Sequence, residues 1–229
     1  MTVLEARGLT KRYGRDSALV RAVDEIDLAV PAGQKLAVMG PSGCGKSTLL
    51  HLLGGLQEPS DGEVWLAGRR IDTLSERALA RLRRDTIGFV FQSFHLMDEL
   101  TAVENVELAA LLAGRSPRTA RRRALHLLDQ VGLADRAGHL PAQLSGGQRQ
   151  RVAVARALTN EPLIVLADEP PGNLDSAATL EMLRLFEELD TTLIVVTHDT
   201  RISAIADRMI TMRDGAFADD TRLAGAVRA

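Results

Sequence analysis

A glycine-rich octapeptide with one lysine and two serines is the strongest chemical signal in the sequence. Its residues, with the threonine that follows, are Gly40, Pro41, Ser42, Gly43, Cys44, Gly45, Lys46, Ser47 and Thr48. Glycines at these spacings let successive backbone N–H groups turn toward a phosphate. Lys46 adds a positive charge for the β- and γ-phosphates, and the Ser47 hydroxyl is a suitable ligand for Mg²⁺. The pattern predicts that residues 40–48 bind a nucleoside triphosphate with Mg²⁺.

Two adjacent carboxylates follow an apolar run. Residues 163–167 are Leu-Ile-Val-Leu-Ala, and Asp168 and Glu169 come directly after them. A buried strand ending here would present both acids at the carboxyl edge of a sheet, beside the phosphate loop. We expect Asp168 to hold Mg²⁺ through its water shell and Glu169 to orient and polarise the attacking water. Two solvated acids at a strand end are the alternative, and the nearby phosphate loop disfavours it.

Two further polar residues end apolar runs. His198 follows residues 193–197, and Gln92 follows residues 87–91. A histidine in isolation is more often structural than catalytic, but at the tip of a neighbouring strand His198 can reach the γ-phosphate. Gln92 can contact Mg²⁺ or water from its own strand end. We therefore add both residues to the predicted site.

A second glycine pair lies about a hundred residues beyond the first loop, in Leu144, Ser145, Gly146, Gly147 and Gln148. A nucleotidase with one self-contained site has no use for it. Together with the phosphate loop it predicts that ATP is held between two copies of the chain.

The elements that must position these residues follow from the apolar pattern. Short apolar runs alternate with helical patterns, which predicts an α/β fold with a largely parallel sheet. Residues 36–39 should form a buried strand entering the phosphate loop, and a helix beginning near Lys46 should bury leucines 49, 50, 52 and 53. Residues 3–9 and 20–30 resemble antiparallel strands. Asp214 and Gly215 predict the turn of a final hairpin.

The middle third, residues 93–158, is predicted to be almost entirely helical. Thr101 and Glu104 fit a capping box, Ser116-Pro117 fits a helix start, and Gly132 fits the end of that helix. We interpret this block as a helical subdomain inserted into a RecA-like core, within a single domain that covers residues 1–229.

Composition excludes some functions. The formal net charge is −2, which argues against a nucleic-acid surface. The arginine runs 81–84 and 121–123 lie in helical patterns without interleaved aromatic residues, so we interpret them as solvated helix faces. The apolar runs are too short to cross a bilayer, so any membrane pore must come from another polypeptide.

Cys44 is the only cysteine, which indicates a reducing compartment. Its place in the loop allows two interpretations, a redox switch at a helix N-terminus or a small side chain at a variable position. We favour the second.

These motifs together resemble the ATP-binding subunits of ABC transporters over essentially the whole chain. The phosphate loop, Gln92, residues 144–148, Asp168-Glu169, Asn173-Leu174-Asp175 and His198 occur in that family's order. Segments 53–56, 89–94 and 168–175 are most similar to the macrolide-export and lipoprotein-release branch. The resemblance implies a P-loop NTPase of ABC type, with a mixed sheet core, an antiparallel β subdomain and an inserted helical subdomain.

The resemblance also implies individual roles. Tyr13 would stack on adenine, and Ser145 and Gly147, flanked by Gly146 and Gln148, would bind the γ-phosphate of the opposite subunit's ATP. Asp175 would signal between the two sites, and Gln92 would link the nucleotide to a membrane partner. Pro171 stands where this branch usually has threonine; it lacks an N–H and stiffens the segment beyond Glu169, which can alter that signalling.

The implied protein is a homodimeric ATPase on the cytoplasmic face of the cell membrane, which drives a separate FtsX-like permease for export or extraction and has no nucleic-acid partner. Its alternatives are a mechanotransmission complex of the cell-division or peptide-sensing type, and a soluble ATPase that acts on DNA or ribosomes. In such systems the permease determines the substrate. Phe94, Leu96 and Met97 fit either a docking groove for the permease or the core of the helical subdomain.

Overall fold

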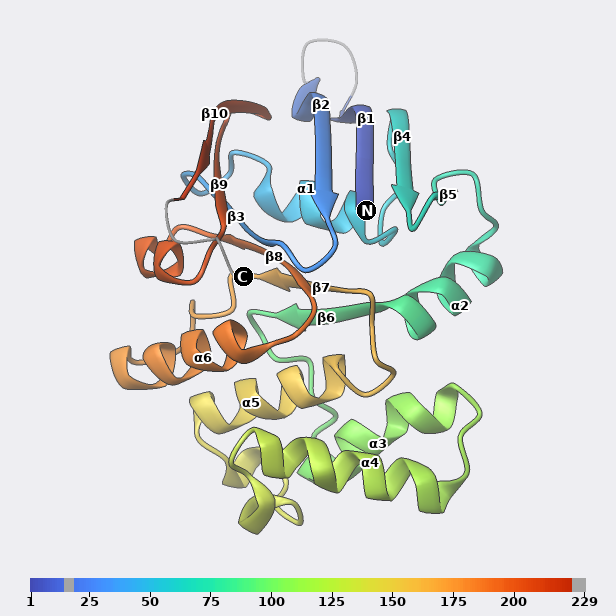
Figure 1. The fold of residues 1–229 in the computed structure, drawn as a ribbon, viewed down its shortest axis with the longest axis vertical. Helices are drawn as coiled ribbons and strands as arrows, with labels where there is room; N and C mark the ends of the chain where they lie inside the picture. Colours follow the sequence, from blue (N-terminus) through green and yellow to red (C-terminus); the bar gives the residue numbers. More distant parts are fainter. Residues whose placement is uncertain (15–18, 224–229) are drawn as a thin grey trace. The chain divides into compact units, whose positions relative to one another are not determined.

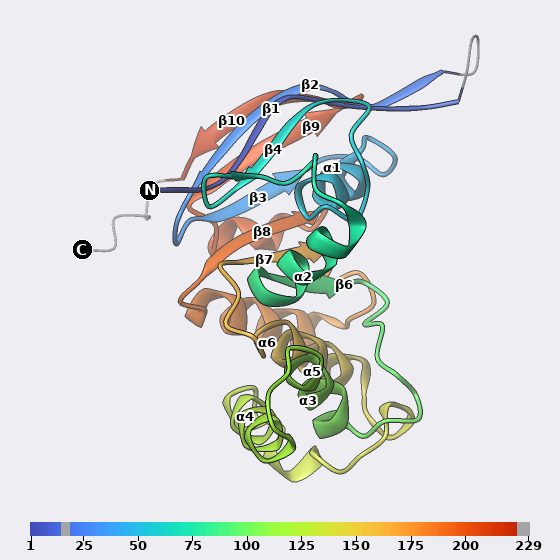
Figure 2. The ribbon, with the colours of Figure 1, turned by 90° about the vertical axis from the view of Figure 1, so that its right-hand side faces the viewer.

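The computed structural model describes residues 1–14 and 19–223. The chain divides into two compact units, unit 1 with Met1–Arg81 and Asp190–Ala229, and unit 2 with Leu82–Leu189. Their elements are labelled in Figure 1 and seen from the side in Figure 2. Within the described part of the chain, no helix combines the length and the apolar character needed to cross a membrane.

Unit 1 contains an antiparallel sheet with the strand order β2-β1-β4-β5. Its strands are β1 (Thr2–Tyr13), β2 (Val20–Pro31), β4 (Asp61–Leu66) and β5 (Arg69–Arg70). Strand β1 pairs with both β2 and β4 in antiparallel register. Over the second half of β2, the buried residues Ile26, Leu28 and Val30 alternate with exposed residues, as a sheet with one buried face requires. The antiparallel strands predicted over residues 3–9 and 20–30 are therefore confirmed, and both are longer than predicted.

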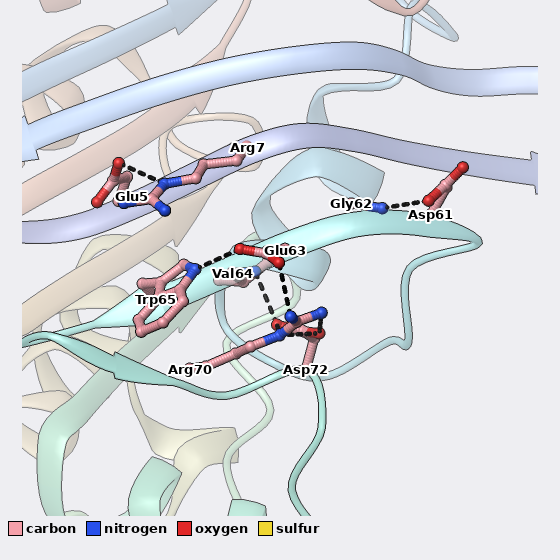
Figure 3. A network of polar contacts seen from close by, with 9 residues as sticks. All are labelled: Glu5, Arg7, Asp61, Gly62, Glu63, Val64, Trp65, Arg70 and Asp72. Carbon is pink, nitrogen blue, oxygen red and sulfur yellow. Dashed lines mark hydrogen bonds and ion pairs between the residues drawn. The ribbon is translucent and has the colours of Figure 1, made fainter.

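Side-chain contacts cover the outer face of this sheet (Figure 3). The Glu5 carboxylate pairs with Arg7 at 2.8 Å, and the Arg7 guanidinium lies over the Trp65 ring, 5.3 Å from its centre. Arg70 pairs with Glu63 at 2.6 Å and with Asp72 at 2.9 Å. Cross-strand pairs of this kind fix register, so they hold β4 and β5 in place.

The second group of strands in unit 1 has the order β10-β9-β3-β8. Strand β3 (Lys35–Met39) is parallel to β8 (Thr192–Thr197) and to β9 (Arg208–Arg213), and β10 (Ala216–Arg222) is antiparallel to β9. The turn between β9 and β10 contains Asp214 and Gly215, both with positive φ, which confirms the predicted hairpin. A short 3₁₀ helix, η4 (Thr200–Ala204), follows β8.

Helix α1 (Lys46–Leu53) connects the two groups of strands in unit 1. It contacts β1 and β2 of the antiparallel sheet and β8 of the other group. Leu49, Leu50, Leu52 and Leu53 are all buried, as the sequence predicts. Burial on both sides fixes the helix that begins at the phosphate loop.

Unit 2 contains a pair of parallel strands, β6 (Ile87–Phe91) and β7 (Ile164–Asp168). Helix α2 (Glu76–Thr86) leads into β6, and α6 (Ser176–Glu188) follows β7. The register pairs Phe91 with Asp168. The two strands therefore end together, and the residues after them start from neighbouring positions.

The helical part of unit 2 consists of α3 (Ala102–Leu112), α4 (Pro117–Gln130) and α5 (Gly146–Ala157), with the 3₁₀ turns η2 (Ala134–Arg136) and η3 (Pro141–Gln143). Helix α5 contacts β6, α3, α4 and α6. Its core joins buried apolar residues from all three helices and the segment before α5: Ala102, Val103, Val106, Ala124, Leu127, Leu128, Val131, Leu133, Leu144, Val152 and Ala155.

The predicted helix signals are present where the sequence places them. Thr101 and Glu104 form the capping box of α3, Ser116 caps α4 before Pro117, and Gly132 follows α4 with φ 68°. The prediction of an almost entirely helical block is too broad, however. Residues 92–101 and most of 131–145 are turns and short 3₁₀ helices. Phe94, His95 and Gly132 in these stretches have positive φ, which a right-handed helix excludes.

Candidate functional site

The phosphate loop lies in unit 1 between β3 and α1. Lys46 is buried, and its Nζ donates to the carbonyl oxygens of Gly40 at 2.9 Å and Pro41 at 3.0 Å. The ammonium group thus lies inside the curve of the loop. None of the described side chains caps the N-terminus of α1, so the positive end of this helix is directed at the loop.

Backbone contacts support the loop from outside. Gly45, the residue before α1, has φ 103°, and a Cβ there would collide with the carbonyl oxygen of Ala22. Gly215 donates its N–H to the carbonyl of Cys44 at 3.1 Å, and Asp24 donates to the carbonyl of Gly215 at 2.9 Å. Only glycine fits position 45, because the loop passes so close to β2.

The sheet register brings His198 next to the phosphate loop within unit 1. Met39 pairs with Thr197, so Gly40 and His198 are the next residues on two adjacent parallel strands. His198 is exposed. Beside it, a hydrogen bond from Arg201 holds the pKa of Asp199 below its ordinary value, against the opposing effect of burial. An ionised carboxylate therefore lies next to His198.

Tyr13 ends β1, and its side chain is 41% exposed. Its hydroxyl donates to Gln57 Oε1 at 2.5 Å, and Lys11 Nζ lies over the ring, 5.5 Å from its centre. An exposed, oriented aromatic ring is suited to stacking on a base.

In unit 2 the carboxylates and Gln92 lie together. Because Phe91 pairs with Asp168, Gln92 and Glu169 continue from adjacent strands. Asp168 and Glu169 are half-buried, and Glu169 has φ 43°. The Gly172 N–H donates to the carbonyl of Glu169 at 3.0 Å and closes a turn there. A left-handed non-glycine residue costs on the order of 1–3 kcal/mol and is concentrated at functional sites.

Gln92 is held by the segment that follows Glu169. Asn173 Nδ2 donates to the Gln92 carbonyl at 2.9 Å. A Cβ added at Gly172 would lie 2.5 Å from Gln92 Nε2, so the Gln92 side chain rests against this glycine. Pro171 is buried and its carbonyl accepts from Leu174 at 2.9 Å. The proline that departs from the family pattern thus lies inside the segment that contacts Gln92.

The residues just beyond Gln92 have an unusual backbone. Phe94 and His95 have φ 61° and 48°, and Phe94 donates its N–H to the Phe91 carbonyl at 3.1 Å. Arg156 of α5 donates through Nη2 to the Phe94 carbonyl at 2.8 Å and through Nη1 to the His95 carbonyl. Arg149 lies over the Phe94 ring, 5.1 Å from its centre. Burial lowers the pKa of Arg156, although an arginine stays charged.

Sequence reasoning missed these two arginines. Their separation of seven residues places them on one face of α5, and that spacing is the signal that points to a shared contact. Phe94 is 9% exposed and Leu96 packs against the helical core, so the structure favours the core interpretation for both. Met97 is 52% exposed.

The second glycine pair begins α5. Ser145 is its N-cap and forms a capping box with Gln148: Ser145 N–H donates to Gln148 Oε1 at 2.9 Å, and Gln148 N–H donates to Ser145 Oγ at 3.2 Å. A Cβ at Gly147 would lie 2.8 Å from Ala178 Cβ of α6. Asp175 caps α6 through the Ala178 N–H at 2.8 Å. The N-termini of α5 and α6 therefore lie side by side.

The structure thus gathers the predicted site residues in two groups. Unit 1 holds residues 40–48 and His198, with Tyr13 at a strand end, and unit 2 holds Gln92, Asp168, Glu169 and residues 145–148. Within residues 1–14 and 19–223, no cluster of three or more histidine, cysteine or acidic side chains is suited to a metal ion.

The chain has a phosphate loop between a parallel strand and a helix, a strand that ends in acidic residues, and a capped glycine pair at the start of another helix. Together these features define a P-loop NTPase of ABC type. The family model described as "ABC transporter" matches residues 23–172. The chain therefore belongs to the ABC transporter family, and it is an ATPase of that family.

Two named relatives and one solved structure illustrate the similarity. The macrolide export ATP-binding/permease protein MacB of Sodalis glossinidius is 48% identical over 96% of this chain, and the chain spans 34% of that protein's length. The lipoprotein-releasing system ATP-binding protein LolD of Legionella pneumophila is 45% identical over 94% of this chain and 96% of its own. The dimeric cassette MJ0796, a bacterial ABC transporter cassette, is 40% identical, covers 97% of this chain and 99% of its own, and has a TM-score of 0.90.

Proposed function

We propose that this chain is the ATP-hydrolysing subunit of an ABC transporter, that it dimerises around two ATP molecules, and that it drives a separate FtsX-like permease for export or extraction from the membrane. The observation that carries the proposal is a second glycine-rich helix start, capped by Ser145. Ser145, Gly146 and Gly147 begin α5 in unit 2, while the phosphate loop lies in unit 1. The cassette MJ0796, similar over nearly the whole chain, is a dimer.

In this proposal each ATP contacts both subunits. Residues 40–48 of one subunit bind the phosphates of the ATP, and Tyr13 of the same subunit stacks on its adenine. Ser145 and Gly147 of the other subunit contact the γ-phosphate, and Gly146 and Gln148 complete that helix start. Closing the dimer therefore requires ATP. Hydrolysis removes the γ-phosphate and with it the contact, so the dimer reopens.

The residues also fit Mg²⁺. Mg²⁺ prefers oxygen ligands and is usually held by one or two carboxylates together with substrate phosphates. The oxygen donors proposed for Mg²⁺ are of these kinds: the Ser47 hydroxyl in unit 1, and the Gln92 amide oxygen and the half-buried Asp168 carboxylate in unit 2. When bound, Mg²⁺ neutralises charge on the β- and γ-phosphates.

The chain's own residues supply the remaining chemistry. Lys46 contributes a positive charge to the β- and γ-phosphates from inside the loop. The Glu169 carboxylate accepts a hydrogen bond from the attacking water and orients it, and His198 contacts the γ-phosphate from the end of β8. Cys44 is buried in the loop and has no part in these steps.

The relatives support the transport assignment. The LolD relative belongs to a lipoprotein-releasing system and matches this chain over almost its whole length, whereas the MacB relative carries a permease in the same protein. We infer a separate permease on the first comparison. The dimer would then lie against the cytoplasmic face of the cell membrane, without a nucleic-acid partner.

The test is the ATPase rate of the purified chain with an FtsX-like permease reconstituted in lipid nanodiscs. We expect a severalfold stimulation that requires both the permease and Glu169. Nanodiscs without the permease are the control. Stimulation by DNA or ribosomes and not by the permease would overturn the proposal, and stimulation without substrate movement would favour mechanotransmission.

A further inference from the structure

We propose that Arg156 is a positioning residue for Gln92, and that it couples the helix that begins at Ser145 to the end of β6. The proposal deepens the proposed function, because it rests on the role assigned there to Gln92. All the contacts that carry it lie within unit 2.

The position of Gln92 depends on the turn that contains it. The Phe91 carbonyl accepts the Phe94 N–H at 3.1 Å, so Gln92 and Ser93 are the two central residues of a turn. Phe94 closes that turn in a left-handed conformation, and His95 repeats it, with φ 61° and 48°. Non-glycine residues leave this region unless their surroundings hold them there. A contact that fixes Phe94 and His95 therefore also fixes Gln92.

Arg156 makes that contact. Its two terminal nitrogens donate to the carbonyls of Phe94 and His95, and these are the two residues in left-handed conformations. A guanidinium presents several donors in a rigid planar fork, whereas a lysine ammonium acts as a single point charge. Lysine at this position would keep the charge and most of the volume but would not hold both carbonyls in the same way.

Gln92 is also fixed from the opposite side. Asn173 donates to its carbonyl and Gly172 receives its side chain, and both residues follow Glu169. Gly146 of α5 lies against the same segment, since a Cβ there would be 3.4 Å from the Asn173 carbonyl oxygen. The first turn of α5 thus borders the segment after Glu169, and its last turn holds the segment after Gln92. Helix α5 therefore contacts both the segment that follows Gln92 and the segment that follows Glu169.

The first experiment compares Arg156→Lys with a matched control. Arg123 also donates to two consecutive carbonyls in unit 2, Leu158 at 3.2 Å and Thr159 at 3.4 Å, but these carbonyls do not follow Gln92. We expect Arg156→Lys to lower kcat about tenfold, which corresponds to the loss of one well-placed interaction, with the KM for ATP unchanged within about twofold. Arg123→Lys should leave kcat near wild type. Wild-type kcat in Arg156→Lys would overturn the proposal.

A rescue experiment separates positioning from stability. His95 and Glu161 are both exposed and both left-handed, with φ 48° and 55°, and glycine accepts this conformation readily. In the Arg156→Lys background we expect His95→Gly to recover most of the lost kcat and Glu161→Gly to recover none. Equal recovery by the two glycines would show a general effect on folding and would contradict the proposal.

A measurement without ATP distinguishes this inference from the proposed function. We expect amide hydrogen exchange in a peptide covering residues 91–95 to become about tenfold faster in Arg156→Lys, with no such change in Arg123→Lys. Unchanged exchange would overturn the inference even if the ATPase behaves as proposed. Faster exchange in a protein without ATP-dependent dimers would support the inference and reject the proposed function.

Discussion

The two groups of site residues are held in place by different means. In unit 1 the phosphate loop is supported by main chain: Gly215 donates to Cys44, and Gly45 passes against the carbonyl of Ala22. In unit 2 the turn with Gln92 is held by side chains, those of Arg156 and Asn173. The loop reaches positive φ with glycine, whereas the unit 2 segments do so with Phe94, His95 and Glu169.

This difference indicates that the phosphate loop and the turn that contains Gln92 have different roles. A loop that is held by backbone contacts and has glycine at its positive-φ positions adopts its conformation without strain. A segment that a few side chains hold in a disfavoured conformation can adopt a second conformation when those contacts change. The phosphate loop is suited to binding, and the turn after β6 is suited to reporting the state of the nucleotide.

The largest effect should come from Gly45→Ala in unit 1. The added methyl collides with the Ala22 carbonyl and occupies φ 103°, so the loop must move. A rearrangement of about 3 kcal/mol would weaken ATP binding by roughly a hundredfold, as measured by isothermal titration calorimetry. Gly33→Ala is the control, because Gly33 has φ 77° with nothing near its Cβ and lies outside the loop. Near-normal affinity in Gly45→Ala would show that backbone contacts do not define the loop.

A small effect confined to stability should come from Asp72→Asn. The Asp72 side chain is 6% exposed; burial raises its pKa, but hydrogen bonds from Arg70 and the Val64 N–H outweigh burial and lower the pKa below the ordinary 3.8. A lowered pKa contributes stability that is fully present above pH 3.8 and is lost as the pH falls through the folded-state value. We expect Asp72→Asn to cost about 1 kcal/mol at pH 7.

Thermal unfolding between pH 7 and the lowest pH at which both proteins still fold measures this cost, and the difference from wild type should shrink toward acid. Asp85→Asn is the control, because Asp85 also pairs with an arginine but is 48% exposed. ATPase activity should not change in either variant. A change in Asp72→Asn would show that the outer face of the antiparallel sheet contributes to the chemistry.

Much of the fold could be predicted because its signals are local. The phosphate loop, the caps at Thr101 and Ser116, and the turn at Asp214-Gly215 are each set by a few adjacent residues with strong conformational preferences, and the structure confirms each element. The apolar runs before Gln92, Asp168 and His198 also predict their strands correctly. Neighbouring parallel strands that end at the same edge of a sheet bring the residues after them close together, so this grouping follows from the predicted strands alone.

The rest depends on contacts between residues far apart in the sequence. Arg156 reaches Phe94 and His95 from positions 62 and 61 residues away. Nothing in the local sequence favours left-handed phenylalanine, because its Cβ disfavours that region, so the stretch after Gln92 was expected to be helical. The contact with Arg156 stabilises a conformation that the sequence around Phe94 opposes.

The central claim is that ATP is held between two copies of this chain, and Glu169→Gln tests it most directly. Glutamine keeps the shape of the side chain and removes the carboxylate that is proposed to orient water, so ATP should bind and persist. With ATP and Mg²⁺, size-exclusion chromatography with light scattering should give a stable dimer of the 24.7 kDa chain, while wild type and the exposed α6 control Glu188→Gln return to monomer as ATP is consumed. A Glu169→Gln protein that hydrolyses ATP at the wild-type rate, or stays monomeric with ATP, would contradict the claim.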